Sequence, residues 1–322
     1  MTRFIDQNRG RFGVEPTCRT LGVSASAYHH RNSGQRSARR VEDERLTGRI
    51  REVHKANYEC YGYGRVHAQL VRDGDQAGRD RVARLMRQDG VQGAKRRGKQ
   101  WKTTIPDPTA HKRPDLVKRD FTAPAPDRLW VGDFTYLRCW DGRLFFAFIP
   151  DVFSRRIVGW QLASNMRTTL VLDALRMALA TRSHGADFEL IHHTDQGSQY
   201  TSDDYEQELR DAKVLSSMGI VGDAYDNAMA ESFVDTFKTE LIKDRVWHSN
   251  TQLELAVVRW VGWYNDVRLH SSLGNHPPAE HEARWRAALA SLPQGQTPPT
   301  VELTLNGVGV YDPFGLVSAV QV

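Results

Sequence analysis

The sequence changes character at residue 128, where aromatic and β-branched runs replace amphipathic helical patterns. Three such runs are separated by short turns and predict consecutive antiparallel strands: "RLWVGDFTYLRCW", "RLFFAFIPDVFS" and "RRIVGWQLAS". Helical and strand patterns then alternate, with a helix at 168–182, a strand at 190–195, a helix at 202–213 and a strand at 214–219. Strands followed by alternating elements predict an α/β fold, in which helices pack on a mixed sheet.

The bulk composition is that of a globular protein. With 322 residues, of which 40% are hydrophobic and 26% charged, the chain can bury a full core and form two or three units. Its longest apolar stretches, such as "LFFAFIP", are shorter than the roughly 20 residues that a membrane helix needs. The start has no apolar block of a secretory signal, and the three cysteines have no metal-binding or disulfide spacing. We therefore expect a cytoplasmic protein without a membrane partner.

Charge is unevenly distributed along the chain. Residues 1–120 carry 27 Lys and Arg against 14 Asp and Glu, whereas residues 121–322 carry 17 against 25. A front third this basic is typical of a polyanion binder, because each neutralised phosphate releases counterions. The acidic remainder would repel DNA unless metal ions intervene.

Two helical segments are expected in the basic part. Residues 1–36 contain a short helix, a turn at Gly22 and a second helix capped by Ser24 or Ser26, which is helix-turn-helix spacing. Residues 40–94 contain three more helical patterns and predict a second DNA-binding helical domain. On its last helix, four arginines remain for solvent or DNA: Arg79, Arg81, Arg84 and Arg87. The alternative is a small helical bundle with a charged surface.

A basic, proline-containing linker is expected over residues 95–124. Five of its cations lie around Trp101 and could follow a phosphate backbone, although basic linkers are often simply solvated: Lys95, Arg96, Arg97, Lys99 and Lys102. At the other end, residues 287–322 are rich in Pro and Gly and show no persuasive pattern, so we expect a loosely ordered tail.

Three acidic residues stand out in the remaining part of the chain. Asp133 lies in the middle of the first predicted strand, although Asp is poorly suited to strands on propensity and desolvation grounds. Asp195 ends a later strand, where a turn or a helix cap is the simpler explanation. Glu231 and Lys238 share a polar stripe of a helix predicted over 223–242, which alone is typical of a solvated face.

The spacing joins these acids, because 35 residues separate Asp195 from Glu231 and a basic residue follows seven positions later. With this D-D-35-E pattern, the chain resembles the retroviral-integrase-like DDE transposases of bacterial insertion sequences. It is most similar to the second-frame product (OrfB) of insertion sequence family three, over about residues 10–285. The resemblance rests on these segments: "FGVEPTCRTLGVSASAYHH", "YGYGRVHAQL", "RLMRQDGVQG", "APDRLWVGDFTYL", "DVFSRRIVGW", "HHTDQGSQYTS", "YDNAMAESF" and "WYNDVRLHSSLGNHPP".

The resemblance implies an RNase H-like integrase core over residues 125–286. In such a core, Asp133 lies on the first strand, Asp195 at the end of the fourth strand and Glu231 on a helix laid across them. The three acids would be catalytic and would hold two Mg²⁺ ions, which Mn²⁺ can replace, because hard cations prefer carboxylate oxygens.

Further residues acquire expected roles beside these acids. Lys238 would contact a DNA phosphate, with a surface salt bridge to Glu231 or Asp235 as its alternative. Asn227 would position substrate or water, or would simply start its helix. Of His192 and His193, one is expected to face the core and the other the site.

The implied function is that of a DNA transposase, which cleaves 3′ ends at its element's terminal inverted repeats and joins them to target DNA. By resemblance, such enzymes first make a circular intermediate, act as homo-oligomers on DNA in the bacterial nucleoid, and use a first-frame partner (OrfA) through a frameshift fusion. The rival hypothesis is a catalytically silent DNA-binding regulator that occupies the element ends. A general RNase H-like nuclease is disfavoured, because it would not require the helix-turn-helix segments.

Overall fold

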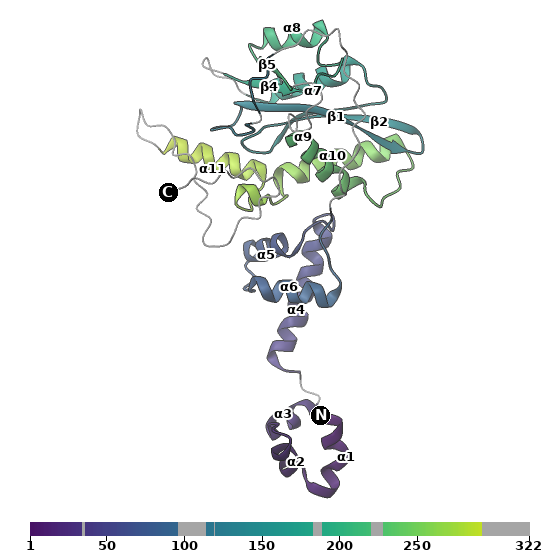
Figure 1. Ribbon diagram of the computed structural model, residues 1–322, viewed down its shortest axis with the longest axis vertical. Coiled ribbons are helices and arrows are strands. Elements are labelled where there is room, and N and C mark those ends of the chain that lie inside the picture. The colour runs from purple at the N-terminus through teal and green to yellow at the C-terminus, as the bar shows by residue number, and fades with distance from the viewer. Residues whose placement is uncertain (34–35, 96–113, 119, 183–188, 220–227, 292–322) are drawn as a thin grey trace. The chain divides into compact units, whose positions relative to one another are not determined.

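The computed structural model describes these parts of the chain: residues 1–33, 36–95, 114–118, 120–182, 189–219 and 228–291. The chain divides into two compact units, Met1–Gly93 and Ala94–Val322, and each is described by itself (Figure 1). Across the described ranges, no helix is long and apolar enough to cross a membrane.

The chain begins with three short helices around a small apolar cluster: α1 (Thr2–Phe12), α2 (Val14–Thr20) and α3 (Ala25–Asn32). Ile5, Cys18 and Tyr28 are buried together. Ser24 caps α3, because its hydroxyl accepts a hydrogen bond from the Ala27 backbone N–H. The predicted pair of helices is confirmed. The sequence pattern does not predict α1, which buries a single residue and so has no apolar stripe.

Three longer helices follow: α4 (Ala38–Ala56), α5 (Tyr63–Arg72) and α6 (Arg79–Asp89). Each turns an apolar stripe inward at helical spacing, and α6, for example, buries Val82, Leu85 and Met86. Gly90 adopts the left-handed conformation that ends α6. The three helical patterns expected here are confirmed.

The second unit is built on one mixed five-stranded sheet. Its strands are β1 (Leu129–Cys139), β2 (Gly142–Pro150), β3 (Ile157–Ala163), β4 (Ile191–Thr194) and β5 (Leu215–Met218). Their order across the sheet is β3-β2-β1-β4-β5. The first three strands form an antiparallel meander, as predicted, and β4 and β5 add to the β1 side in parallel.

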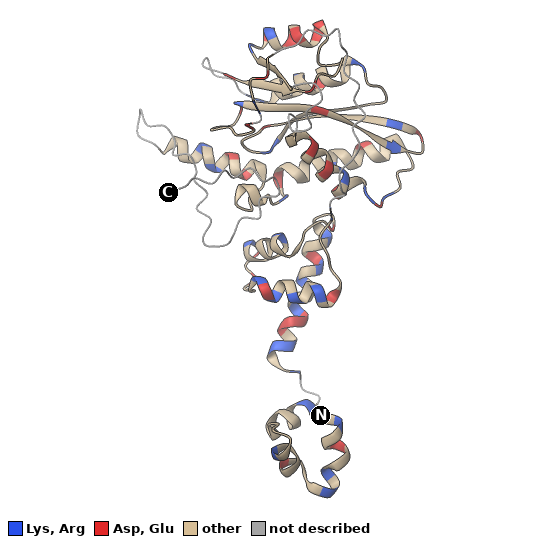
Figure 2. Ribbon diagram, viewed as in Figure 1, with Lys and Arg blue, Asp and Glu red and all other residues tan. Residues whose placement is uncertain are grey.

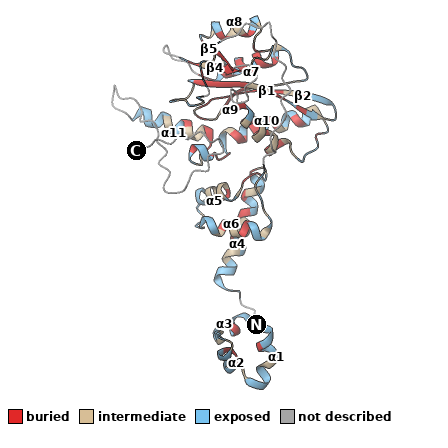
Figure 3. Cartoon of the chain, in the orientation of Figure 1, coloured by how far each residue is buried: buried red, intermediate tan, exposed pale blue. Residues whose placement is uncertain are grey.

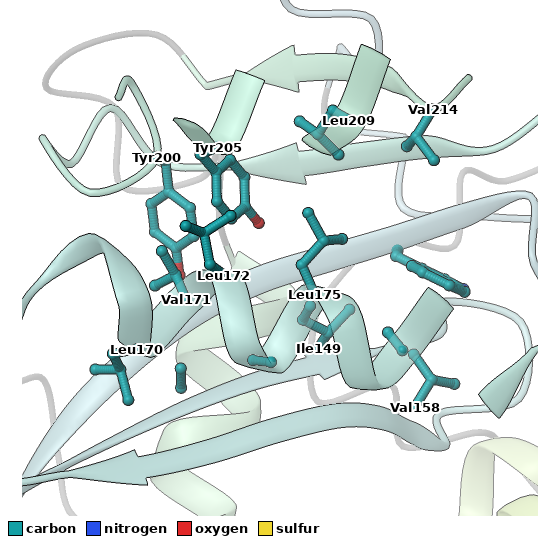
Figure 4. Packing of buried hydrophobic residues seen from close by; sticks show 14 of the residues in the cluster. Ile149, Val158, Leu170, Val171, Leu172, Leu175, Tyr200, Tyr205, Leu209 and Val214 are labelled. Carbon is teal, nitrogen blue, oxygen red and sulfur yellow. The ribbon is translucent and has the colours of Figure 1, made fainter. Parts of the chain in front are cut away.

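Helices α7 (Thr168–Thr181) and α8 (Asp203–Asp211) cover one face of this sheet and enclose the main core (Figures 3 and 4). Leu175 of α7 is buried there with Ile149 of the sheet (Figure 4). Close approach depends on Gly159, because a Cβ at this position would stand 2.1 Å from the Ala174 carbonyl oxygen.

The opposite face of the sheet carries α9 (Ala228–Phe237), the π-helical turn η1 (Lys238–Ile242) and α10 (Asn250–Asp266). Aromatic rings make this contact: the ring centroids of Phe148 and Phe233 are 4.3 Å apart, and those of Phe146 and Phe237 are 4.8 Å apart. Trp260 of α10 packs edge-on against both helical phenylalanines.

The helix predicted over 223–242 is only partly regular. Its described part begins at Ala228, and the chain widens into the π-helical turn after Phe237. This turn carries the buried carboxylate of Glu240, which makes a 2.6 Å ion pair with buried Arg268. The π turn therefore brings a charged side chain inward, where a continuous α-helical pattern would not predict one.

The last described helix, α11 (Pro278–Ala290), is attached through a buried carboxylate rather than an apolar stripe. Glu282 accepts hydrogen bonds from Arg182 at 2.5 and 2.9 Å and from the Ser154 hydroxyl at 2.7 Å. Burial alone would raise the pKa of Glu282, but the bonds from Arg182 lower it below its ordinary value. The helix extends beyond the boundary expected at residue 286.

Candidate active site

Two aspartates lie at the same level of the sheet, Asp133 within β1 and Asp195 directly after β4. In the register between β1 and β4, Gly132 pairs with Thr194, and Asp133 and Asp195 are the next residues of the two segments. Because parallel strands lie about 4.8 Å apart, this register places the two aspartates side by side. A Cβ at Gly132 would stand 2.8 Å from Cε1 of His192, so glycine permits the strands to approach beside the pair.

The two carboxylates are half-buried. Burial raises the pKa of Asp133 well above its ordinary value, and the charges of Asp195 and Glu231 raise it further. Burial also raises the pKa of Asp195. In each aspartate Oδ1 accepts a backbone hydrogen bond, from Phe134 at 2.7 Å and from Gly197 at 3.0 Å respectively.

Glu231 approaches from the helix that crosses this face of the sheet. Asp133 and Phe148 are register partners on β1 and β2, and such partners share one face of a sheet. Phe148 packs on Phe233 of α9, two residues beyond Glu231. The Glu231 side chain is exposed, and after burial and Asp195 its charge is a further cause of the raised pKa of Asp133. Asp133 is therefore within electrostatic reach of both other acids.

Lys238 is a cation beside Asp133. It begins η1, directly after α9, and is half-buried. Burial lowers the pKa of its ammonium group, and the negative charge of Asp133 raises it. The ammonium nitrogen also lies 5.0 Å from the centroid of the Tyr136 ring. Such a position suits contact with a phosphate held near the carboxylates.

Comparison with known proteins identifies the family. The family profile described as "Integrase core domain" matches residues 123–224, a second profile of the same description matches 212–278, and "HTH-like domain" matches 41–99. Over 297 residues the chain is 43% identical to the transposase for insertion sequence element IS629 of Shigella sonnei, which covers 90% of this chain and 98% of that protein. The chain belongs to the insertion sequence transposases.

A second relative of this transposase is the putative transposase for insertion sequence element IS986/IS6110 of Mycobacterium tuberculosis. The two are 44% identical over 271 residues, which covers 83% of this chain and 97% of that protein. The resemblance to family-three transposases is thereby confirmed. Among solved structures, a chain of the simian T-cell lymphotropic virus intasome is 13% identical, with a TM-score of 0.44 over 78% of this chain and 77% of that chain.

Family membership fixes the general activity and the fold class. This transposase is a recombinase of DNA transposition, a polynucleotidyl transferase that binds DNA through its HTH-like and integrase core domains. Its mixed sheet with flanking helices is the integrase catalytic core, and helical segments precede it. The fold predicted from the sequence is therefore confirmed.

The two adjacent histidines face opposite sides of the sheet. His192 is buried in the main core, where its Nε2 lies 2.7 Å from the Tyr205 hydroxyl. His193 faces the aspartates: its Nδ1 lies 2.9 Å from the Ser217 hydroxyl, and it lowers the pKa of Asp195, which burial raises. One histidine faces the core, as expected, and the other lies on the face of the sheet that carries the aspartates.

The four arginines of α6 divide into two pairs. Arg79 and Arg87 are exposed, as expected for side chains that meet solvent or DNA. Arg81 and Arg84 are half-buried, and both bond to Asp43 of α4, at 2.7 and 2.8 Å. Hydrogen bonds from Arg84 and then Arg81 lower the pKa of Asp43. This second pair therefore joins two helices, which departs from the expectation for all four.

Of the predicted linker cations and Asn227, the structure describes only Lys95. Lys95 is exposed, and its carbonyl oxygen accepts a 3.5 Å hydrogen bond from Lys243. The other predicted residues lie outside the described residues: Arg96, Arg97, Lys99, Lys102 and Asn227.

The chemistry of the three carboxylates matches a divalent cation. Their hard oxygen atoms and mutual repulsion favour binding of an ion such as Mg²⁺. In the part of the chain that the structure describes, no three His, Cys, Asp or Glu side chains converge to hold one ion. Mg²⁺ ordinarily uses one or two protein carboxylates and completes its shell with water and phosphate oxygens. The arrangement therefore fits ions shared between carboxylates and DNA, rather than an all-protein cage.

Sequence reasoning missed two residues of this region. Tyr200 is buried, and burial raises the pKa of its hydroxyl well above the ordinary value, with Asp133 raising it further. The hydroxyl therefore stays protonated beside the acids. Gly132 was detectable, because a glycine inside a strand often marks close backbone approach. Tyr200 carries no comparable signal, since a tyrosine after a turn is usually a core residue.

Proposed function

We propose that this transposase cleaves 3′ ends at the termini of its element and joins them to target DNA by metal-dependent transesterification. Asp133, Asp195 and Glu231 are the catalytic acids. The observation that supports this most directly is the placement of both aspartates at one level of adjacent strands, with Glu231 close enough to raise the pKa of Asp133. Carboxylates that repel each other in a half-buried position are characteristic of functional sites.

Each aspartate presents one oxygen for a ligand. Oδ1 of Asp133 and Oδ1 of Asp195 accept backbone hydrogen bonds, which orient the two carboxylates, and Oδ2 of each would ligate an ion. Two Mg²⁺ ions, which Mn²⁺ can replace, would activate the attacking water or 3′-hydroxyl and stabilise the leaving 3′-oxygen. Lys238 contacts a phosphate beside the scissile bond.

The basic part of the chain recognises the terminal inverted repeats. Arg79 and Arg87, exposed on α6, contact phosphates. The linker cations continue this contact: Lys95, Arg96, Arg97, Lys99 and Lys102. Asn227 positions substrate or water one helical turn before Glu231. The active form is a homo-oligomer on DNA, with the upstream first-frame product joined to this chain.

The test is an end-cleavage and strand-transfer assay on DNA that carries the element's own terminus. The protein is the full chain fused to its upstream product, with Mg²⁺ or Mn²⁺. We expect Asp133→Asn, Asp195→Asn and Glu231→Gln each to abolish nicked and joined products and to leave end binding largely unchanged. Asp204→Asn, an exposed acid on α8, is the matched control and should retain activity.

Two outcomes would contradict the proposal. Binding of the ends without any metal-dependent product in the unaltered fusion would favour the regulator, which occupies the ends without cutting them. Loss of end binding in all three acid variants, but not in Asp204→Asn, would instead give the acids a structural role.

A further inference from the structure

The outer face of the β1–β2 hairpin carries an alternating row of aromatic and basic side chains. Tyr136 and Arg138 share one face of β1, and Trp140 follows directly after the strand, in the hairpin turn. Tyr136 is 44% exposed and Trp140 is 74% exposed. Leu137, between them, faces the interior and is buried. Large aromatic side chains held in solvent on a strand and in the turn that follows it indicate a binding surface.

Two arginines stand opposite each other on this hairpin. Arg138 of β1 and Arg143 of β2 are register partners, and both are exposed. Like charges directly opposite on paired strands destabilise the pair. Within the described residues, neither guanidinium has a carboxylate within ion-pairing distance, and Arg138 instead lies 5.8 Å from the Tyr136 ring centroid. In Figure 2, blue marks basic residues on β1 and β2 near the turn that joins them. A polyanion would relieve this repulsion.

Alternation places Tyr136 and Arg138 on the face of β1 opposite Asp133, and Lys238 links this row to the candidate active site. The Lys238 ammonium lies 5.0 Å from the centroid of the Tyr136 ring, and the charge of Asp133 raises its pKa, which burial lowers. At the far end, the Trp140 ring packs edge-on against His248, with centroids 4.1 Å apart. The Trp140 backbone N–H also donates to the Trp247 carbonyl at 3.0 Å. The indole is therefore both exposed and held in place.

We propose that this row, Lys238, Tyr136, Arg138 and Trp140 with Arg143, binds an unpaired DNA strand next to the scissile phosphate. The proposal rests on the proposed function of the site. Unpaired bases stack on aromatic rings while cations contact the backbone, and this combination is typical of single-strand binding surfaces. A duplex keeps its bases stacked inside and would leave the rings of Tyr136 and Trp140 unused. An acidic peptide would match the charges but offers no planar faces.

The experiment maps contact with a single strand by photo-crosslinking. The probe is an oligothymidylate of about 16 nucleotides that contains 5-iodouracil, mixed with the full chain carrying Asp133→Asn in EDTA. We expect crosslinks to Tyr136 or Trp140 in the hairpin peptide, identified by mass spectrometry. Trp140→Ala and Arg138→Glu should each lower the crosslink yield of the hairpin peptide about tenfold.

Arg210→Glu is the matched charge reversal, because Arg210 is exposed on α8. It should leave the hairpin crosslink unchanged, and thermal unfolding of all variants should remain close to that of the parent chain. The proposal is overturned if Arg138→Glu and Arg210→Glu behave alike, or if polyglutamate competes as well as unmodified oligothymidylate. The single-strand binding proposal can fail independently of the proposed function, because crosslinking needs neither metal nor cleavage. Nicking without hairpin crosslinks rejects this proposal alone, and hairpin crosslinks without nicking reject only the proposed chemistry.

Discussion

Asp133 and Asp195 stand one residue beyond the register pair of Gly132 and Thr194, so two carboxylates distant in sequence occupy equivalent positions on adjacent parallel strands. This relationship depends on glycine, which has no side chain, at position 132. His192 fills the space where a larger residue at 132 would place its Cβ. The local sequence thus sets the spacing of the aspartates through packing rather than through the carboxylates themselves.

We predict that Gly132→Ala disturbs the site without touching a carboxylate. The new methyl group would stand 2.8 Å from Cε1 of His192 and 3.2 Å from Cγ2 of Thr194, so β1 and β4 must separate or the buried imidazole must move. Overpacking of this kind costs about 1 to 3 kcal/mol of stability. We expect a lower melting temperature in calorimetry and a disproportionate loss of end cleavage at temperatures where the variant is still folded.

Gly262→Ala is the control for this substitution. Gly262 lies within α10, and a Cβ there meets nothing within 4 Å. Alanine in a helix interior should leave stability unchanged or raise it by about 0.5 to 1 kcal/mol. If Gly132→Ala were as active and stable as Gly262→Ala, glycine would have no role in the strand spacing.

Much of this arrangement can be predicted from the sequence, because strands and amphipathic helices have local signatures. The meander, the parallel strands and most helices follow from aromatic runs and apolar periodicity. The acids were found because an aspartate inside a strand, such as Asp133, conflicts with strand propensity and desolvation. The 35-residue spacing from Asp195 to Glu231 then joined them.

Features that depend on tertiary partners could not be predicted in this way. Helix α11 buries the charged Glu282, which is acceptable only because Arg182 and Ser154 come from distant segments. The π-helical turn similarly buries Glu240 against Arg268, 28 residues later. From its local sequence alone, a charged residue is expected at the surface. Glu282 and Glu240 are buried instead, because each bonds to an arginine that is distant in the sequence.

We predict that Arg268→Ala destabilises the core and impairs the site through η1. The substitution leaves the Glu240 carboxylate buried without its bidentate partner, and breaking a buried pair costs about 3 to 5 kcal/mol. Because Lys238 begins the same turn, its ammonium should move relative to Asp133. Urea denaturation measures the stability loss, and strand-transfer assays at low temperature measure the effect on the site.

The control for this prediction is Arg210→Ala, which breaks an exposed ion pair with Glu206 on α8. Exposed pairs contribute little, so stability and strand transfer should change little. Addition of Glu240→Gln to Arg268→Ala should restore part of the lost stability, because the second substitution removes the unpaired charge. An equal effect of Arg268→Ala and Arg210→Ala would show that the buried pair is unimportant.

We predict that Asp151 contributes to the pH dependence of stability. This carboxyl is fully buried, and burial raises its pKa from 3.8 to about 6 despite hydrogen bonds from Ser154 and the Asp127 backbone N–H. The folded chain therefore holds the proton more tightly than the unfolded chain. The resulting stabilisation is present below about pH 4 and is lost as the pH rises through about 6. The loss across this window is about 3 kcal/mol.

Urea denaturation at intervals from pH 4 to pH 7 tests this dependence. Asp151→Asn should be less stable than the parent at low pH, because its amide has a single oxygen, whereas Asp151 accepts from Ser154 at Oδ1 and from the Asp127 backbone N–H at Oδ2. Its stability should nevertheless change less with pH across the same window. Parallel stability curves for the two proteins would show that Asp151 does not titrate there.

We predict that the arginines of α6 separate into DNA-contacting and structural residues. Arg87→Ala removes an exposed cation, so the slope of log affinity for duplex DNA against log salt should fall by about 0.9, with stability unchanged. Arg84→Ala removes a 2.8 Å bond to Asp43 and should lower the melting temperature, with little effect on the slope. Fluorescence anisotropy across a salt series and calorimetry measure the two quantities. A larger change of slope for Arg84→Ala than for Arg87→Ala would mean that DNA draws Arg84 away from Asp43.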